Sequence, residues 1–212
     1  MPSFASIRNN KNIYLYAGDL SETLLENEDN KFVGLSIQKT DSNHISFDIT
    51  NKFPLKDNSV DVFCAEDVME HIEYKKQINI FNEIYRILKP NGVFRLAVPD
   101  YRCDILLDRT IKNKKGELKF DPGGGGSFSK LRRKVIKGGH VWFPIYESVK
   151  EIFDNSLFNK TKVNFLHFYQ ANGKGVLNEI DYTICFIKRT PDNDLRVANP
   201  RRPMSIVVDA IK

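Results

Sequence analysis

Residues 59–99 read SVDVFCAEDVMEHIEYKKQINIFNEIYRILKPNGVFRLAVP, and this stretch decides the fold. It begins with an apolar strand pattern, continues into a helical pattern and ends in a Pro-Asn-Gly turn and a second apolar strand. Two parallel strands joined by a crossover helix have this pattern. Because parallel strands bring their carboxyl ends to one sheet edge, where open α/β folds bind small ligands, the corner after Ala65 is the first candidate site.

Four ionisable side chains crowd that corner: Glu66, Asp67, Glu70 and His71. Four buried groups of this kind would repel one another, so some must be solvated or paired. A His among carboxylates can move protons near neutral pH, although His71 is equally suited to hydrogen-bond the loop that it caps. We expect no metal, because the sequence offers no second His at helical spacing and zinc usually needs three or four softer ligands.

Strand and helix patterns flank this unit on both sides. Further strands are predicted at 12–17, 32–37, 44–49, 163–169 and 204–211. Helices are predicted at 74–88 and 146–153, and the acidic ENEDN at 26–30 is predicted to be a turn. Strands that alternate with helices in this way indicate an α/β fold with a mostly parallel sheet covered on both faces.

The length of 212 residues suits a single domain with one sizeable core, so we expect one domain over 1–212. The net charge of +5 is unevenly distributed, because residues 101–140 contain eleven Lys and Arg against four acids and leave a remainder of −2. This +7 segment includes the run Gly123 to Gly126, and long loops of this kind are functional or disordered. We expect a lid or insertion at about 101–140; the alternative is a solvated insertion that carries lysines because it is exposed.

Neither a membrane span nor a disulfide framework is indicated. No apolar run approaches the roughly 20 residues that cross a bilayer, and the amino terminus has no apolar segment of the signal-peptide kind. The cysteines Cys64, Cys103 and Cys185 are far apart and lack CxxC spacing. We expect a cytoplasmic protein without a membrane span, and the sequence makes no prediction of oligomeric state.

The ends of the first two strands argue against a classical NAD or ATP site. The second strand ends at Ser36 instead of an acid that accepts both ribose hydroxyls, and the first ends in a lone Gly18-Asp19 instead of G-x-G-x-x-G. Asp48 stands at the end of the third strand before a Phe-Pro loop. Its carboxylate can accept an amino group from a purine edge or cap a turn.

Several segments together carry a family resemblance. These are Asp48-Ile49, FPLKDNSVDVF at 53–63, VMEHI at 68–72, EIYRILKPNGVFRLAVPD at 83–100 and GHVWFPIYESVKEIF at 139–153. In order and spacing they resemble class I S-adenosylmethionine-dependent methyltransferases of the methyltransferase type 11 kind, over most of the chain. The resemblance implies a Rossmann-like three-layer sandwich whose seven-stranded, mostly parallel sheet has an antiparallel last strand.

The resemblance also implies S-adenosylmethionine as cofactor and a set of binding positions. Gly18 and Asp19 are expected beside the methionine part, Ser36 near the ribose, Asp48 and Ile49 at the adenine, and Glu66 facing the cofactor. In the family the first strand ends in an acidic-x-Gly-x-Gly-x-Gly loop. YAGDLSE in this chain keeps only Gly18 of those glycines.

Methyl transfer requires an aligned nucleophile and, in some cases, removal of a proton. We name His71 and His140 as candidate bases and Asp100 as a residue that orients them. Substrate-pocket roles are expected for Tyr101, Arg102 and Trp142.

Three functions follow as hypotheses. The leading one is a methyltransferase acting on a small-molecule or sugar-like acceptor. The second is a catalytically weak or inactive binding protein with the same fold, which the shortened first loop favours. The third is a nucleic-acid methyltransferase or binder using the +7 segment. It is disfavoured because that segment lacks interleaved aromatic residues and the fourth strand is not followed by an Asn-Pro-Pro-Tyr-like sequence.

Overall fold

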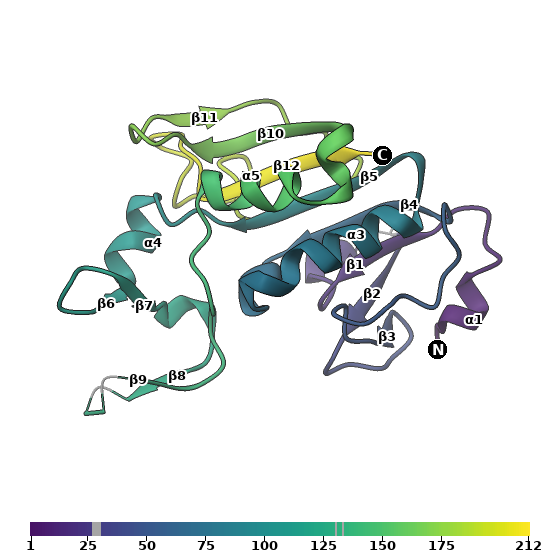
Figure 1. Ribbon diagram of the computed structural model, residues 1–212, viewed down its shortest axis with the longest axis horizontal. Helices are drawn as coiled ribbons and strands as arrows, with labels where there is room; N and C mark the ends of the chain where they lie inside the picture. The colour runs from purple at the N-terminus through teal and green to yellow at the C-terminus, as the bar shows by residue number, and fades with distance from the viewer. Residues whose placement is uncertain (27–30, 130, 133) are drawn as a thin grey trace.

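A computed structural model describes residues 1–26, 31–129, 131–132 and 134–212. Most of the turn expected at 26–30 therefore lies outside the described residues. Eight strands form the main sheet, in the spatial order β11-β10-β12-β5-β4-β1-β2-β3 (Figure 1). Their bounds are β1 Tyr14–Ala17, β2 Phe32–Ser36, β3 His44–Ser46, β4 Val60–Glu66, β5 Leu88–Pro99, β10 Lys162–Tyr169, β11 Gly175–Leu177 and β12 Ser205–Ile211.

The sheet is parallel through its centre and antiparallel at one side. β3, β2, β1, β4 and β5 pair in parallel with their neighbours, whereas β12 runs antiparallel to both β5 and β10. The mostly parallel sheet with an antiparallel last strand is thus confirmed. The short β11 adds an eighth strand that the sequence did not predict, paired antiparallel to β10 at the edge.

Two helices cover one face of the sheet, as Figure 1 shows for α3 and α5. The α-helices are α1 Phe4–Ile7, α2 Glu22–Glu26, α3 Gln77–Ile87, α4 Asp104–Arg109 and α5 Tyr146–Asp154. The 3₁₀ turns are η1 Met69–His71, η2 Tyr74–Lys76, η3 Pro122–Gly124 and η4 Leu157–Lys160. The helix predicted at 74–88 is therefore η2 followed by α3, and it ends as the chain turns into β5.

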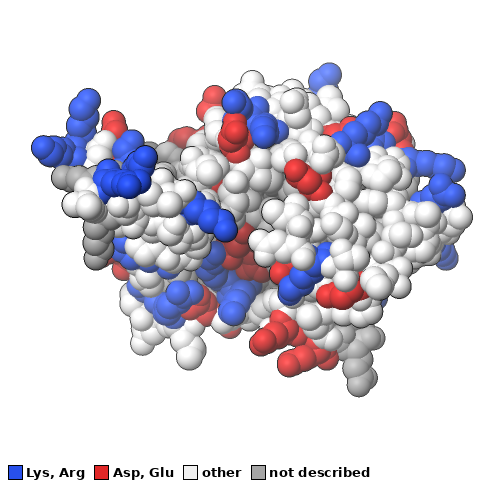
Figure 2. Space-filling view, turned by 90° about the horizontal axis from the view of Figure 1, so that it is seen from below, with Lys and Arg blue, Asp and Glu red and all other residues white. Residues whose placement is uncertain are grey.

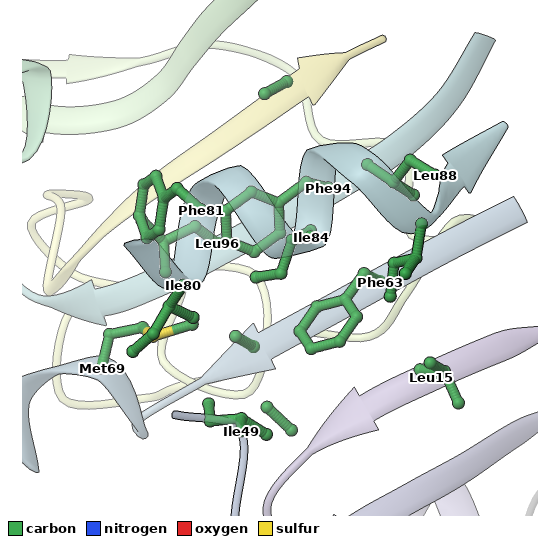
Figure 3. Packing of buried hydrophobic residues seen from close by; sticks show 14 of the residues in the cluster. Leu15, Ile49, Phe63, Met69, Ile80, Phe81, Ile84, Leu88, Phe94 and Leu96 are labelled. Carbon is green, nitrogen blue, oxygen red and sulfur yellow. The ribbon is translucent and has the colours of Figure 1, made fainter. Parts of the chain in front are cut away.

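The main core lies between α3, α5 and the sheet (Figure 3). Helical spacing places Phe81 and Ile84 of α3 on the buried side. Phe81 packs edge-on to Phe94 of β5 with ring centroids 5.1 Å apart, and Phe94 meets Phe63 of β4 at 5.9 Å. These contacts fix the β4–α3–β5 unit, and with it the position of the corner that follows β4.

The opposite face is covered by irregular chain instead of long helices. A second core joins Tyr16, Cys64 and Ala97 of the sheet to Ile180 and Ile187. In the described residues of the connections β1–β2, β2–β3 and β3–β4, the only helix is the five-residue α2. Residues 178–204, which we call the covering segment, supply much of the third layer of the sandwich.

The basic, glycine-rich part of the chain forms an arm beside the sheet, at lower left in Figure 1. We define the arm as residues 104–137. Besides α4 and η3 it holds two hairpins, made by β6 Ile111–Lys112 with β7 Leu118–Phe120 and by β8 Ser127–Ser129 with β9 Lys134–Lys137. Within the described residues, no helix has the length and apolarity needed to span a bilayer.

Candidate active site

A cavity of about 760 Å³ lies at the carboxyl ends of the parallel strands. Its walls include Gly18 after β1, Ser36 at the end of β2, Asp67 after β4 and His71 in η1. Ligand pockets typically measure roughly 300–1,000 Å³. The corner that the sequence singled out thus opens onto a space large enough for a nucleotide-sized ligand.

Gly18 brings bare backbone to this cavity. Its φ of +91° is a conformation that L side chains rarely adopt, and a Cβ there would lie 3.0 Å from Cγ2 of Val68. Its N–H donates to the carbonyl of Leu35 at 2.8 Å, which ties the loop after β1 to β2. Only glycine satisfies both constraints at this position.

Four other predicted cofactor positions also line the cavity: Asp19, Ser36, Asp48 and Ile49. The Ser36 hydroxyl accepts the N–H groups of Gln38 and Lys39, both at 3.0 Å. Asp48 accepts the N–H of Thr50 at 2.9 Å, so it caps a turn while it faces the cavity. The two sequence interpretations of Asp48 are therefore compatible.

Glu66 lies in a different place. It lines a second cavity of about 280 Å³ instead of the main one. Its carboxylate accepts the N–H of Lys188 at 2.7 Å and the hydroxyl of Tyr16 at 3.3 Å. Burial, together with the neighbouring charge of Asp67, raises the pKa of Glu66 to about 7. That Glu66 faces the cofactor stays a prediction.

Asp67 is the carboxylate of the corner that lines the main cavity, and the sequence did not assign it a role. Its backbone has φ of +57°, an uncommon conformation for a residue other than glycine. Oδ2 pairs with Arg189 of the covering segment, whereas Oδ1 is buried and has no hydrogen-bond partner in the described part of the chain. Strain and an unpartnered oxygen at a cavity wall are typical of functional positions. The only sequence signal was its membership of the acidic corner.

Glycines of the arm and of the chain after it form the wall opposite the sheet edge. Gly124, Gly125 and Gly126 line the cavity together with Gly138 and Gly139. A Cβ on Gly126 would lie 2.5 Å from the backbone of Gly138, and both residues have positive φ. The two glycine runs approach closely because neither carries a side chain there.

A buried polar cluster lies behind this wall. The His71 and His140 rings meet edge-on with centroids 4.7 Å apart, and Nε2 of His140 is 3.6 Å from Oε1 of Glu70. Tyr101 donates its hydroxyl to Asp121 at 2.7 Å and contacts Nδ1 of His140. Burial lowers the pKa of His140 to about 4, with a smaller contribution from His71. The fold thus joins the two candidate bases, although only His71 lines the cavity.

The remaining predicted residues lie outside the walls of both cavities. Asp100 is fully buried and accepts the N–H groups of Arg102 at 3.0 Å and Tyr169 at 2.8 Å; burial raises its pKa to about 6. Arg102 pairs with Glu147 at 2.6 Å, and the Trp142 indole donates to the carbonyl of Met69 at 2.9 Å. Together with Tyr101, these side chains hold the segments around the polar cluster, and their substrate-pocket roles stay predictions.

Seen from below, the molecule is hollowed between the arm and the sheet, with acidic atoms on the floor of the hollow (Figure 2). The acidic residues that line the main cavity are Asp19, Asp48, Asp67 and Glu73. Lys and Arg side chains gather over the arm in the same view. Three of these acids already pair with cations, Asp19 with Lys39, Asp67 with Arg189 and Glu73 with Lys75, and Lys76 also lines the cavity, so the acidic lining does not by itself select a cationic ligand.

Comparisons with known proteins agree with this architecture. Residues 3–96 match a family model described as a methyltransferase domain. The fold resembles a crystallised SAM-dependent methyltransferase from Archaeoglobus fulgidus, with a TM-score of 0.52 and 15% identity over 99% of this chain and 90% of that one. A Methanosarcina mazei SAM-dependent methyltransferase gives a TM-score of 0.51 and 13% identity over 95% and 92% of the two chains.

A third structure, an S-adenosylmethionine-dependent methyltransferase from Mesorhizobium loti, has a TM-score of 0.51 and 13% identity over 94% of this chain and 90% of that one. No curated protein matches the sequence. At these identities the structural likeness establishes the fold, which is that of class I S-adenosylmethionine-dependent methyltransferases. The family model matches less than half of the chain, so the two comparisons together establish a methyltransferase-like fold.

Proposed function

We propose that the protein binds S-adenosylmethionine in the main cavity and transfers its methyl group to a small-molecule or sugar-like acceptor. The observation that carries the proposal is the cavity of about 760 Å³ at the carboxyl edge of a methyltransferase sheet. It combines the side-chain-free backbone of Gly18 with the unpartnered, buried Oδ1 of Asp67.

The residues present fit this cofactor. The bare backbone of Gly18 leaves room for the methionine part, and the Asp67 carboxylate can accept a hydrogen bond from its ammonium group. Leu35, Phe47 and Ile49 offer apolar contacts for the adenine ring on the β2–β3 side. S-adenosylmethionine supplies an electrophilic methyl group when it is bound.

The acceptor is proposed to enter between His71 and the glycine wall. His71 is exposed and lines the cavity, whereas His140 is 5% exposed and lies behind Gly139. Of the two candidate bases, His71 is therefore the better placed to accept a proton from an acceptor. In this proposal, residues 101–140 act as the lid, because their glycines form one wall of the cavity.

The alternative function, binding without catalysis, has support from the loop after β1. The N–H of Leu20 donates to Nε2 of His44 at 3.0 Å and so is not available to a ligand. Asp19 is paired with Lys39 at 3.0 Å. A loop whose polar groups are satisfied within the protein offers fewer contacts to the methionine part.

A nucleic-acid function has less support. Phe120 and Phe128 of the arm stack on each other with centroids 5.4 Å apart, and Phe120 is buried. These rings are used for packing, whereas single-stranded nucleic acid is held by aromatic rings free to stack on bases.

Turnover tests the proposal directly. Chelator-treated protein would be supplied with S-adenosylmethionine and a panel of alcohols, sugars and amines, with release of S-adenosylhomocysteine as the readout. Amines belong in the panel because a Thermotoga maritima structure of the same fold (TM-score 0.51, 12% identity, 94% of this chain and 81% of that one) is titled a possible histamine N-methyltransferase.

We expect acceptor-dependent release that falls about 100-fold in His71→Gln, the usual contribution of a general base. His167→Gln is the matched control, because Nε2 of His167 contacts the carbonyl of Asn178 in the fold and does not line the main cavity. Bound cofactor without release from any acceptor would favour the non-catalytic alternative.

A further inference from the structure

We propose that Glu70, His71 and His140 bind a divalent transition-metal ion, for which Zn²⁺ is the probe. One potential ligand atom from each of the three lies within 4.8 Å of the others. Two imidazoles and a carboxylate form a donor set used by zinc sites that keep an open position. The sequence predicted no metal because no second His lies at helical spacing from His71. In the fold, His140 lies beside His71.

Glu70 supplies the independent observation. Its side chain is fully buried, and neither carboxylate oxygen has a hydrogen-bond partner among the residues that the structure describes. A buried carboxylate without partners is costly, so native proteins protonate such a group, pair it or use it to bind a metal. Oε1 points to Nε2 of His140 at 3.6 Å, too long for a hydrogen bond and close to the separation of about 3.4 Å expected for two ligands of one tetrahedral zinc.

The hydrogen bonds around His140 orient its lone pair toward Glu70. Tyr101 donates its hydroxyl to Asp121, which also pairs with Arg109 at 2.7 Å, so the Tyr101 oxygen is left to accept a hydrogen bond from the Nδ1–H of His140. Nε2 is then unprotonated and faces the Glu70 carboxylate. Two acceptors that face each other need a positive atom between them, and outer-sphere contacts of this kind commonly fix the tautomer of a metal-binding His.

His71 is oriented in a corresponding way. Its Nδ1 lies 3.1 Å from the carbonyl of Gly139, to which it donates, and this leaves Nε2 free as a ligand. The segment that contains Gly139 and His140 is held beside Glu70, because Val141 donates its N–H to the Glu70 carbonyl at 2.9 Å. A Cβ on Gly124 would lie 2.5, 2.5 and 2.7 Å from Cδ2, Nε2 and Cε1 of the His140 ring, so only a residue without a side chain fits against this part of the ring.

The ion would lie at the wall of the main cavity, which His71 and Gly139 line. Three protein ligands leave a position for water or for an oxygen of the acceptor on that side. His71 bound to a metal no longer accepts a proton, so base catalysis by His71 belongs to the metal-free protein. The metal site does not depend on the proposed methyl transfer.

Calorimetric titration of the untagged, chelator-treated full chain with Zn²⁺ tests the site in the absence of cofactor and acceptor. We expect one ion per chain, and binding about 100-fold weaker or more in Glu70→Gln and in His71→Asn. Glu70→Gln removes no hydrogen bond, and His71 is exposed, so circular dichroism should show both variants folded. Glu73→Gln, which removes an exposed carboxylate outside the cluster, should bind Zn²⁺ like the wild type.

Co²⁺ provides a second readout. Its visible spectrum in the wild type should show tetrahedral nitrogen and oxygen coordination, without the intense near-ultraviolet band of a thiolate ligand, because Cys64, Cys103 and Cys185 are buried away from the cluster. The proposal is overturned if the wild type binds no Zn²⁺ at micromolar concentrations, or if Glu70→Gln and His71→Asn both bind it as tightly as the wild type does.

Discussion

Glu66 and Asp67 are neighbours in sequence and both line the second cavity, yet of the two only Asp67 also lines the main cavity. Glu66 is the last residue of β4, and Asp67, which follows it with a positive φ, begins the loop that borders the main cavity. The acidic corner that the sequence singled out lies at the walls of these cavities. The sequence could not distinguish the two carboxylates, because Glu66 accepts hydrogen bonds from the backbone N–H groups of Lys188 and Arg189, about 120 residues later in the chain.

The raised pKa of Glu66 has a consequence for stability. The groups that face it are the Tyr16 hydroxyl, the Asp67 carboxylate and the Arg189 guanidinium. Its pKa is 4.5 in the unfolded chain and about 7 in the fold, so the folded state binds the proton more tightly. The resulting stabilisation is complete below pH 4.5 and is lost as the pH rises through 7, in total about 3 kcal/mol.

Urea unfolding of the wild type and Glu66→Gln at several values between about pH 5 and 7 measures this effect. The free energy of unfolding of the wild type should fall with rising pH more steeply than that of the variant, by about 1 kcal/mol per pH unit. Gln keeps an oxygen for the Lys188 N–H and does not titrate. Equal slopes in the two proteins would contradict the raised pKa.

The covering segment packs against one face of the sheet, in the place where helices would otherwise cover it. Arg95 of β5 is fully buried and pairs with Asp209 of β12 through two 2.7 Å hydrogen bonds. The same guanidinium donates to the carbonyls of Asp181 and Cys185 at 2.7 and 2.8 Å. One side chain therefore anchors irregular chain to the centre of the sheet.

Arg95→Met should lower the free energy of unfolding by about 3–5 kcal/mol, because it leaves Asp209 without its cation and two carbonyls without donors. The matched control is Arg201→Met, which removes a pair with Asp192 whose side chains are 54% and 37% exposed. That variant should lose less than about 1 kcal/mol. Similar losses in the two variants by urea unfolding would contradict the anchoring role of Arg95.

An element could be predicted from the sequence when the residues that determine it lie close together in the chain. α3 and β5 were predictable because apolar spacing and the Pro-Asn-Gly turn lie within 59–99. β11 and the hairpins of the arm were not, since strands of two to four residues are set by pairing and glycine geometry more than by hydrophobic pattern. The Glu70–His140 pairing was equally hidden, because it joins residues 70 positions apart in the chain.

For the whole molecule, the arm and the sheet edge together determine which ligand fits. The +7 charge of residues 101–140 suggested an anionic partner when taken by itself. In the fold, Arg109, Arg102 and Lys119 are paired with acids, and the cavity that the arm helps to close is lined by four acidic residues.

The central claim is that the main cavity holds the cofactor, and calorimetric titration with S-adenosylhomocysteine tests it most directly. We expect saturable binding of one ligand per chain, weakened at least about tenfold in Gly18→Ala, where a Cβ meets Val68. Gly173→Ala is the matched control, because its φ of +81° imposes similar strain with no atom within 4 Å, and it should bind like the wild type. The absence of heat at millimolar ligand, or equal affinity in Gly18→Ala, would contradict the account.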